Sequence, residues 1–355
     1  MNTHFFHQPA EWAPHEAVWL AWPSHAELWG DSLTQVQDEF IALCQNISDF
    51  DVKSGKSRGE RLEILIHPDH APEHTAPAQK ALGHLNVRFH RIAFGDIWLR
   101  DTAPIFVQNK TGQIEPTVFQ FNGWGEKYIL PNDNEVALKI SKITSPQRSR
   151  SFDWILEGGS IEVDGEGTAL TTEQCLLNPN RNPRMTRSDL EVALRESLGI
   201  EKVLWLKTGL LNDHTDGHID TLARFVSPTT VVTLRAKHPS DPNFKVLEEI
   251  YRDLSSMTDA RGRKLKVIAL PSPGEILDEE GEIMPASYSN FYIGNTTVIV
   301  PTYGSPHDAE AVQTLSKLFN NRKTVGCSAR SILEGGGAFH CITQQQPTQR
   351  NGGGS

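Results

Sequence analysis

Apolar residues along the chain follow two periods, and segments of the two kinds alternate. Five segments carry apolar residues three or four positions apart, which is the pattern of an amphipathic helix. Six short runs of β-branched and apolar residues lie between them and predict strands. The predicted helices span residues 34–48, 132–143, 188–198, 242–257 and 308–320. The predicted strands span residues 62–67, 118–121, 202–206, 230–234, 265–270 and 296–301. This alternation favours an α/β fold.

The third predicted helix has recognisable signals at both ends. The run Ser188-Asp189-Leu190-Glu191 has the spacing of a capping box, and Gly199 suits the left-handed residue that commonly ends a helix.

The chain also contains a faint internal repeat. The turns at 165–168, 227–230 and 294–297 each open a strand, at intervals of about 65 residues. The run at 155–159 is echoed at 332–336. This pattern predicts repeated units of a few strands and one helix around a centre. A chance likeness between strand-turn patterns is the alternative.

Residues 144–151 are the one candidate for a linker, and they are short and polar enough to be a surface loop. We therefore expect one domain over residues 1–347. A flexible tail rich in Gly is expected at 348–355.

Composition limits the classes of function. The 355 residues are 38% hydrophobic, and no stretch approaches the roughly 20 apolar residues that a membrane helix needs. Residues 1–9 lack a basic region followed by an apolar run, so no secretory signal is visible and the cytoplasm is predicted. A net charge of −10 argues against nucleic acid and is compatible with a cationic substrate.

The four cysteines are too scattered for a disulfide scaffold, and no CxxC pair suggests zinc. Cys44 and Cys175 lie in apolar contexts typical of structural thiols, whereas Cys341 follows three glycines. Glycines allow the backbone to pass close to a ligand, which makes Cys341 a candidate nucleophile. Gly337 is then a candidate for substrate contact. A buried structural thiol is the alternative.

A histidine and two carboxylates share one short segment, Asp216-Gly217-His218-Ile219-Asp220. On an extended strand His218 and Asp220 would project from the same face, because side chains alternate there. This predicts a general acid/base beside an anion. Asp216 is a further candidate for substrate contact. A structural histidine is the alternative.

Two more carboxylates lie in contexts that suit a site. Glu157 follows two apolar residues and precedes Gly158-Gly159, so it would lie at the end of a buried strand, or else in a simple turn. Asp101 could accept guanidinium N–H bonds while Trp98 covers the cation, or it could merely pair with Arg100. Asp96 could replace Asp101.

Taken together, these segments resemble the agmatine deiminase family, within the guanidino-group-modifying enzymes that share the pentein fold. The resemblance covers nearly the whole chain. Its blocks are Pro9-Ala10-Glu11-Trp12-Ala13-Pro14-His15-Glu16, Trp19-Leu20-Ala21-Trp22-Pro23, Trp98-Leu99-Arg100-Asp101-Thr102, Phe121-Asn122-Gly123-Trp124-Gly125, Leu156-Glu157-Gly158-Gly159-Ser160, Leu176-Leu177-Asn178-Pro179-Asn180-Arg181-Asn182-Pro183, Gly217-His218-Ile219-Asp220 and His340-Cys341-Ile342-Thr343-Gln344-Gln345-Gln346-Pro347.

The resemblance implies a five-bladed α/β propeller of ββαβ units with the active site at its centre. It implies that Cys341 is the nucleophile, His218 the general acid/base and Glu157 the residue that orients His218. Asp101 and Asp220 would hold the guanidinium. Neither a metal nor an organic cofactor is implied, and a homodimer is compatible with the family.

Two departures from the family's pattern concern the distal half of the substrate. Asp216 stands where many of these enzymes have Asn, and the segment 273–288 looks shorter than in many of them.

The predicted reaction is hydrolytic deimination through a covalent cysteine intermediate, with agmatine as the first candidate substrate. Arginine, peptidyl-arginine or another guanidine would use the same chemistry. Amidinotransfer is a more distant alternative, and a non-catalytic propeller that binds a partner is the alternative from another class.

Overall fold

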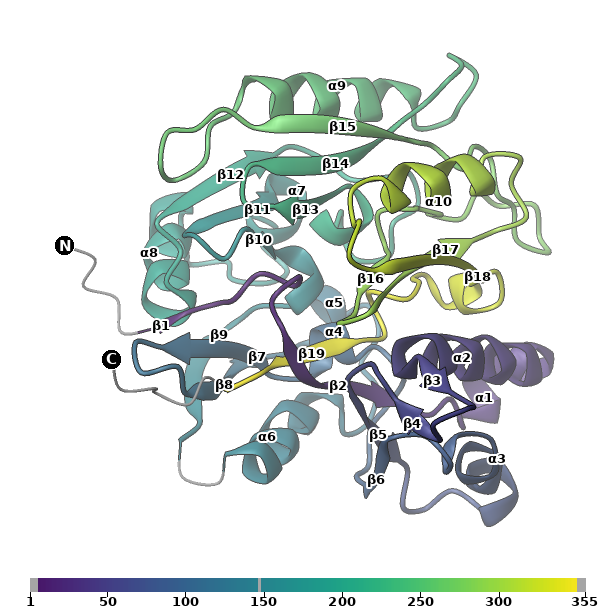
Figure 1. The fold of residues 1–355 in the computed structure, drawn as a ribbon. Helices are drawn as coiled ribbons and strands as arrows, with labels where there is room; N and C mark the ends of the chain where they lie inside the picture. The colour runs from purple at the N-terminus through teal and green to yellow at the C-terminus, as the bar shows by residue number, and fades with distance from the viewer. Residues whose placement is uncertain (1–5, 146–147, 350–355) are drawn as a thin grey trace.

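Five small sheets of the computed structural model, which describes residues 6–145 and 148–349, repeat one topology (Figure 1). In one of them, β10 (Glu162–Val163) is antiparallel to β11 (Thr168–Thr172), and β11 is parallel to β12 (Lys202–Leu206). Helix α8 (Arg187–Leu198) connects the two parallel strands, because such a connection requires a crossover. This is the predicted ββαβ unit.

The other units follow the same order of elements. They are β7 (Ile105–Asn109), β8 (Ile114–Gln120), α6 (Asp133–Thr144) and β9 (Arg150–Ile155); β13 (Ala223–Ser227), β14 (Thr230–Arg235), α9 (Phe244–Ser256) and β15 (Lys266–Pro271); β16 (Tyr292–Ile293), β17 (Thr297–Thr302), α10 (Asp308–Ser316) and β18 (Lys323–Ser328); and β19 (Gln344–Pro347), β2 (His15–Ala21), α2 (Leu33–Ser48) and β5 (Arg61–Ile66).

The remaining elements extend or connect these units. They are the edge strand β1 (Phe6–His7), α3 (Pro72–Leu82) and β6 (Val87–Arg91), the hairpin of β3 (Phe50–Asp51) and β4 (Lys56–Ser57), the short helices α1 (Ala26–Trp29), α4 (Leu99–Thr102), α5 (Gly123–Glu126) and α7 (Glu173–Leu176), and the 3₁₀ turns η1 (Gly30–Ser32), η2 (Gly158–Ser160), η3 (Ile219–Thr221) and η4 (Ile332–Gly335).

One unit joins the two ends of the described chain. Its first strand, β19, comes from the C-terminal end and pairs antiparallel with β2 near the N-terminal end, with Gln344 opposite Trp19. The two strands lie side by side in Figure 1. The sheet order is therefore circular, as a pseudo-symmetric propeller requires.

The predicted elements agree closely with the observed ones. All five predicted helices and all six predicted strands exist, with ends that differ by at most four residues. The repeated turns at 165–168, 227–230 and 294–297 lead into β11, β14 and β17, so they mark the second strand of three units.

The predicted capping box of α8 is wrong by two residues. The box is formed by Thr186, whose hydroxyl accepts the backbone N–H of Asp189, while the Asp189 carboxylate accepts the backbone N–H of Thr186. Thr186 has extended backbone angles that suit an N-cap, so the helix begins before Ser188. The predicted stop is confirmed, because Gly199 has a φ of 73°.

Candidate active site

The five units bring five short segments together, because each contributes the residues just before its first strand. These residues are Asp101 before β7, Glu157 before β10, His218 and Asp220 before β13, Asn290 before β16, and Cys341 before β19. All are buried. These residues are far apart in sequence, but each occupies the equivalent position in its unit, and together they form one cluster.

The Cys341 thiol lies between an amide and a carboxylate. Its Sγ is 3.0 Å from Asn290 Nδ2 and 3.5 Å from Asp220 Oδ2. Burial raises the pKa of Cys341 well above its usual range, and the negative charges of Asp220 and Asp101 add to this. The resting thiol is therefore neutral. A cation placed beside these carboxylates would favour the thiolate.

His218 lies between two carboxylates. Its Nε2 is 3.5 Å from Glu157 Oε2, and its Nδ1 is 3.8 Å from Asp101 Oδ2. Burial acts to lower the pKa of His218, but the charge of Asp101 and contacts with Cys175 and Glu157 raise it well above its usual range. The resting ring is therefore an imidazolium that can give a proton to a leaving group.

The predicted strand geometry for His218 and Asp220 is wrong. His218 precedes the 3₁₀ turn η3, and Asp220 lies within that turn. The Thr215 hydroxyl accepts the backbone N–H of His218 and helps hold the turn. The two side chains therefore reach the cluster through a turn and not by strand alternation.

A buried ion pair with Arg181 holds Glu157 in place. Arg181 Nε donates to Glu157 Oε1 at 3.0 Å, and both side chains are fully buried. Although burial opposes it, hydrogen bonding to His218 and the charge of Arg181 lower the pKa of Glu157. Arg181 also pairs with Asp216, which forms a second ion pair with Lys127 at 2.9 Å. Glu157 is thus an oriented anion.

Asp220 is held by a second buried network. His340 Nδ1 lies 2.7 Å from Asp220 Oδ2, and His340 Nε2 lies 2.9 Å from Glu11 Oε2. Glu11 in turn pairs with Arg224. This leaves Asp220 Oδ1 buried with no hydrogen-bond partner among the described residues. That oxygen is available to accept an N–H from a ligand.

Asp101 is oriented by a tryptophan and a glycine. Trp124 Nε1 donates to Asp101 Oδ2, and the Gly159 backbone N–H donates to Asp101 Oδ1, each at 2.8 Å. Burial raises the pKa of Asp101, against the opposing charge of His218. A Cβ at Gly159 would lie 2.6 Å from His218 Nδ1, so this position requires glycine.

A cavity of about 250 Å³ opens onto this cluster. Trp98 and Gly337 line it together with Asp101 and Cys341, as predicted for residues that contact a substrate. Its lining residues are Leu28, Asp96, Trp98, Asp101, Trp124, Tyr128, Leu130, His214, Thr215, Glu334, Gly335, Gly336, Gly337 and Cys341. Asp216 is not among them, since Arg181 and Lys127 engage its carboxylate.

Sequence reasoning did not single out several residues of the cluster. Asn290 bonds to the thiol, and His340, Arg181, Glu11 and Arg224 support the two carboxylates. All but Asn290 and Arg224 lie inside the motif blocks quoted above, which was the available signal. Asn290 follows Ser287-Tyr288-Ser289, a polar run with no recognisable motif.

A family model described as Porphyromonas-type peptidyl-arginine deiminase matches residues 7–347. The chain belongs to this family. It is 38% identical to the agmatine deiminase of Ectopseudomonas mendocina, over 96% of this chain and 95% of that one. Solved structures are also similar. The Enterococcus faecalis agmatine deiminase has a TM-score of 0.87 at 34% identity, covering 98% of this chain and 97% of the other. A C. jejuni agmatine deiminase with substrate bound has a TM-score of 0.86 at 29% identity, covering 97% of each.

The predicted family resemblance and the pentein fold are therefore confirmed.

The buried cluster also contains two groups with the spacing of metal ligands, Glu157–Cys175–His218 and Glu11–Glu162–His340. A buried guanidinium, from Arg181 or Arg224, already pairs with each group. A metal cation there would face another cation at close range.

No helix in residues 6–145 and 148–349 is long and apolar enough to cross a membrane.

Proposed function

We propose that the chain hydrolyses agmatine to N-carbamoylputrescine and ammonia. The observation that supports this most strongly is the placement of a neutral thiol and a charged histidine among three carboxylates, in a buried cluster at the end of a small cavity. A planar cation is the ligand that such a cluster would stabilise.

The first half of the reaction releases ammonia. Asp101 and Asp220 accept the guanidinium N–H groups, and the bound cation favours ionisation of the Cys341 thiol, whose proton passes to solvent. The thiolate attacks the central carbon and forms an S–C bond. His218 gives its proton to one nitrogen, the C–N bond breaks, and ammonia leaves. A thiouronium cation remains on Cys341.

The second half adds water. Neutral His218 takes a proton from water, which attacks the thiouronium carbon. The C–S bond breaks, the hydroxyl proton of the intermediate passes to the departing sulfur, the neutral thiol of Cys341 is restored, and the ureido product leaves. Glu157 keeps the ring oriented in both halves. This scheme requires no metal or organic cofactor, because the substrate cation is itself the electrophile.

The charge of the cavity favours agmatine over free arginine. Three carboxylates, those of Asp96, Asp101 and Glu334, line the cavity, and none of its described lining residues is Lys or Arg. An adjoining cavity of about 730 Å³ adds Asp213 and four more acids between 278 and 282, against one cation, Lys127, which pairs with Asp216. A distal ammonium would be attracted there, whereas the α-carboxylate of arginine would be repelled.

The proposed function is tested by measuring ammonia and ureido product from agmatine, free arginine and a blocked arginyl peptide in parallel. Turnover of agmatine alone, lost in Cys341→Ser and kept in Cys327→Ser, is expected. Cys327 is a matched control because it is half-buried on β18, and in the described part of the chain its thiol accepts a side-chain bond only from Asn46. Turnover of another guanidine would replace the substrate, and silence on all three would favour a binding protein.

Free cysteines are consistent with the predicted cytoplasmic location, since Cys341 must stay reduced to act as a nucleophile. The homodimer stays a prediction.

A further inference from the structure

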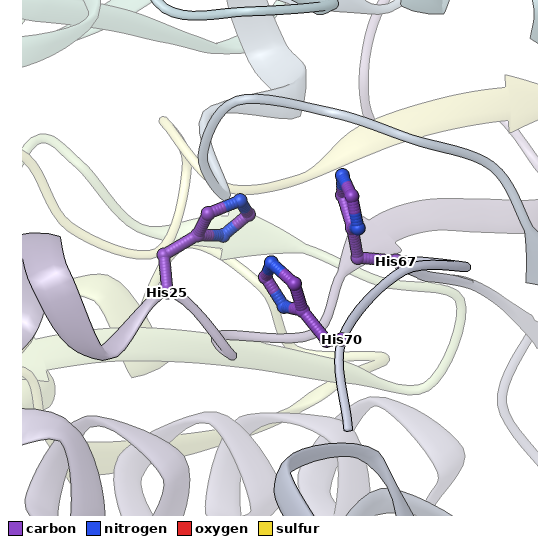
Figure 2. Close-up of side chains that lie close together, drawn as sticks. All are labelled: His25, His67 and His70. Carbon is purple, nitrogen blue, oxygen red and sulfur yellow. The ribbon is translucent and has the colours of Figure 1, made fainter. Parts of the chain in front are cut away.

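Three histidines meet outside the active-site cluster. His25 precedes α1, His67 directly follows β5, and His70 lies shortly before α3. Figure 2 shows their rings close together, reached from these separate segments. One potential ligand atom from each residue lies within 4.8 Å of the others. The rings of His67 and His70 are stacked, with centroids 4.1 Å apart.

The three rings are withdrawn from solvent to different degrees. His25 and His67 are 7% and 8% exposed, while His70 is half-buried and leaves a route to the outside. The Nδ1 atom of His25 is buried and has no hydrogen-bond partner within residues 6–145 and 148–349. Leaving a buried polar atom unpaired costs free energy. A metal ion bound to this nitrogen would remove that cost.

The surroundings suit ligation by neutral imidazole. His67 Nδ1 accepts the backbone N–H of Asp69 at 3.3 Å, so a metal ion on that nitrogen would replace this one bond. Ser24 Oγ lies 2.8 Å from His70 Nδ1. A second partner of this kind orients metal-binding histidines and fixes their tautomer.

The local charges also favour a cation, though not without opposition. Glu27 and Asp69 contribute negative potential at the cluster. Lys139 and His74 act in the opposite direction on His67 and His70 respectively.

We propose that His25, His67 and His70 bind a divalent transition-metal ion, with Zn²⁺ as the first candidate and water as a fourth ligand. Tetrahedral Zn²⁺ with Zn–N bonds of 2.0–2.1 Å places its nitrogens about 3.3 Å apart. The present separations of up to 4.8 Å require small ring rotations. His70 is the least buried of the three and has the most room to turn.

Such an ion would stabilise a turn that borders the active-site cavity. The His25 carbonyl accepts the backbone N–H groups of Leu28 and Trp29. Leu28 lines the cavity, and Trp29 donates to Asp96, which also accepts from Trp98. The metal site would thus connect the segment before α1 with the segment between β5 and α3.

The test uses the full chain, freed of metal by a chelator and titrated with Co²⁺ and with Zn²⁺. Co²⁺ is expected to bind one per chain and to give the visible absorption of a tetrahedral site with nitrogen ligands. His70→Gln and His67→Gln are expected to weaken binding by at least about tenfold. His238→Gln, an exposed histidine paired only with Ser240, is the matched control and should bind as the parent does.

Two results would overturn the proposal. One is the absence of stoichiometric binding to the folded parent chain. The other is binding that both His variants retain while Cys341→Ser loses it, because this would assign the ion to the catalytic cluster. His70→Gln changes a half-buried residue and is expected to fold, so a loss of binding there is not explained by unfolding. Circular dichroism of each variant checks this.

Discussion

Cys341 and His218 both keep their protons in the resting enzyme, so the thiol is neutral and the imidazole is charged. Burial keeps the thiol neutral, and neighbouring carboxylates keep the imidazole charged. A cysteine and a histidine in these states do not react until a cation arrives. The guanidinium is therefore both the substrate and the charge that activates the nucleophile.

Glu157→Gln tests the electrostatic part of this account. Contact with Glu157 helps raise the pKa of His218, so its loss should lower that pKa. Since the reaction needs the imidazolium, the alkaline limb of the kcat profile should move to lower pH. The raised pKa of His218 also stabilises the folded state. This stabilisation is complete at pH values below the pKa of the histidine in the unfolded chain, and it is lost as the pH rises through its pKa in the folded chain. An unmoved alkaline limb would contradict the assignment.

Gly159→Ala tests the packing of the same residues. The added Cβ would lie 2.6 Å from His218 Nδ1 and 3.1 Å from both Asp101 Oδ1 and Asp220 Oδ2. We expect kcat to fall by at least about 100-fold, because displacements of about 1 Å have such effects. Gly326→Ala on β18 is the control, since its Cβ meets two side-chain methyl carbons at 3.0 Å. Equal kcat in both variants would contradict the prediction.

At the scale of elements, the loop after α7 supports the cluster through Arg181. Arg181→Met removes the closer of the two cationic partners of the buried Glu157, and breaking a buried ion pair typically costs about 3–5 kcal/mol of unfolding free energy. Arg187→Met removes the exposed pair with Glu173 and should cost less than about 1 kcal/mol. Denaturant unfolding of both variants measures the difference. Equal costs would show that the buried pair has no special weight.

Sequence reasoning reached the residues of the site more easily than their geometry. Cys341, Glu157 and Asp101 could be singled out from glycine-rich or aromatic contexts that suit a ligand. The path of the backbone at His218 could not be predicted, because a polar residue after a glycine is compatible with both a 3₁₀ turn and a strand. The roles of Asn290 and Arg224 depend on contacts between distant units, which no local pattern encodes.

At the scale of the whole molecule, the chain forms a closed order of five units. The repeated turns and alternating periods predicted these units, since each has its own helix and parallel strand pair. The first strands were not predicted, because all are only two to five residues long, and four strands of the parallel pairs, β2, β9, β11 and β18, were not predicted either. The pairing of β19 with β2 joins distant ends, so periodicity alone could not reveal it.

Removal of β19 tests this closure. A chain that ends at Thr343 loses the antiparallel partner of β2 and the bonds from Arg100 to Gln344 and Gln345, while the parallel partner β5 remains. It should unfold at a lower temperature and lose activity, because the segment with Cys341 is no longer anchored. A chain that ends at residue 349 is the control. Equal thermal unfolding, followed by circular dichroism, would contradict the closure.

The most direct test of the central claim is the mass of the protein during turnover. The enzyme is mixed with agmatine, the reaction is quenched in acid, and the protein is digested. The mass of the peptide that contains Cys341 is then measured. We predict a peptide heavier by the mass of agmatine minus ammonia, which is the thiouronium adduct. Rapid product formation with no such adduct under any quench time, or an adduct on Cys175 instead, would contradict the assignment of Cys341 as the nucleophile.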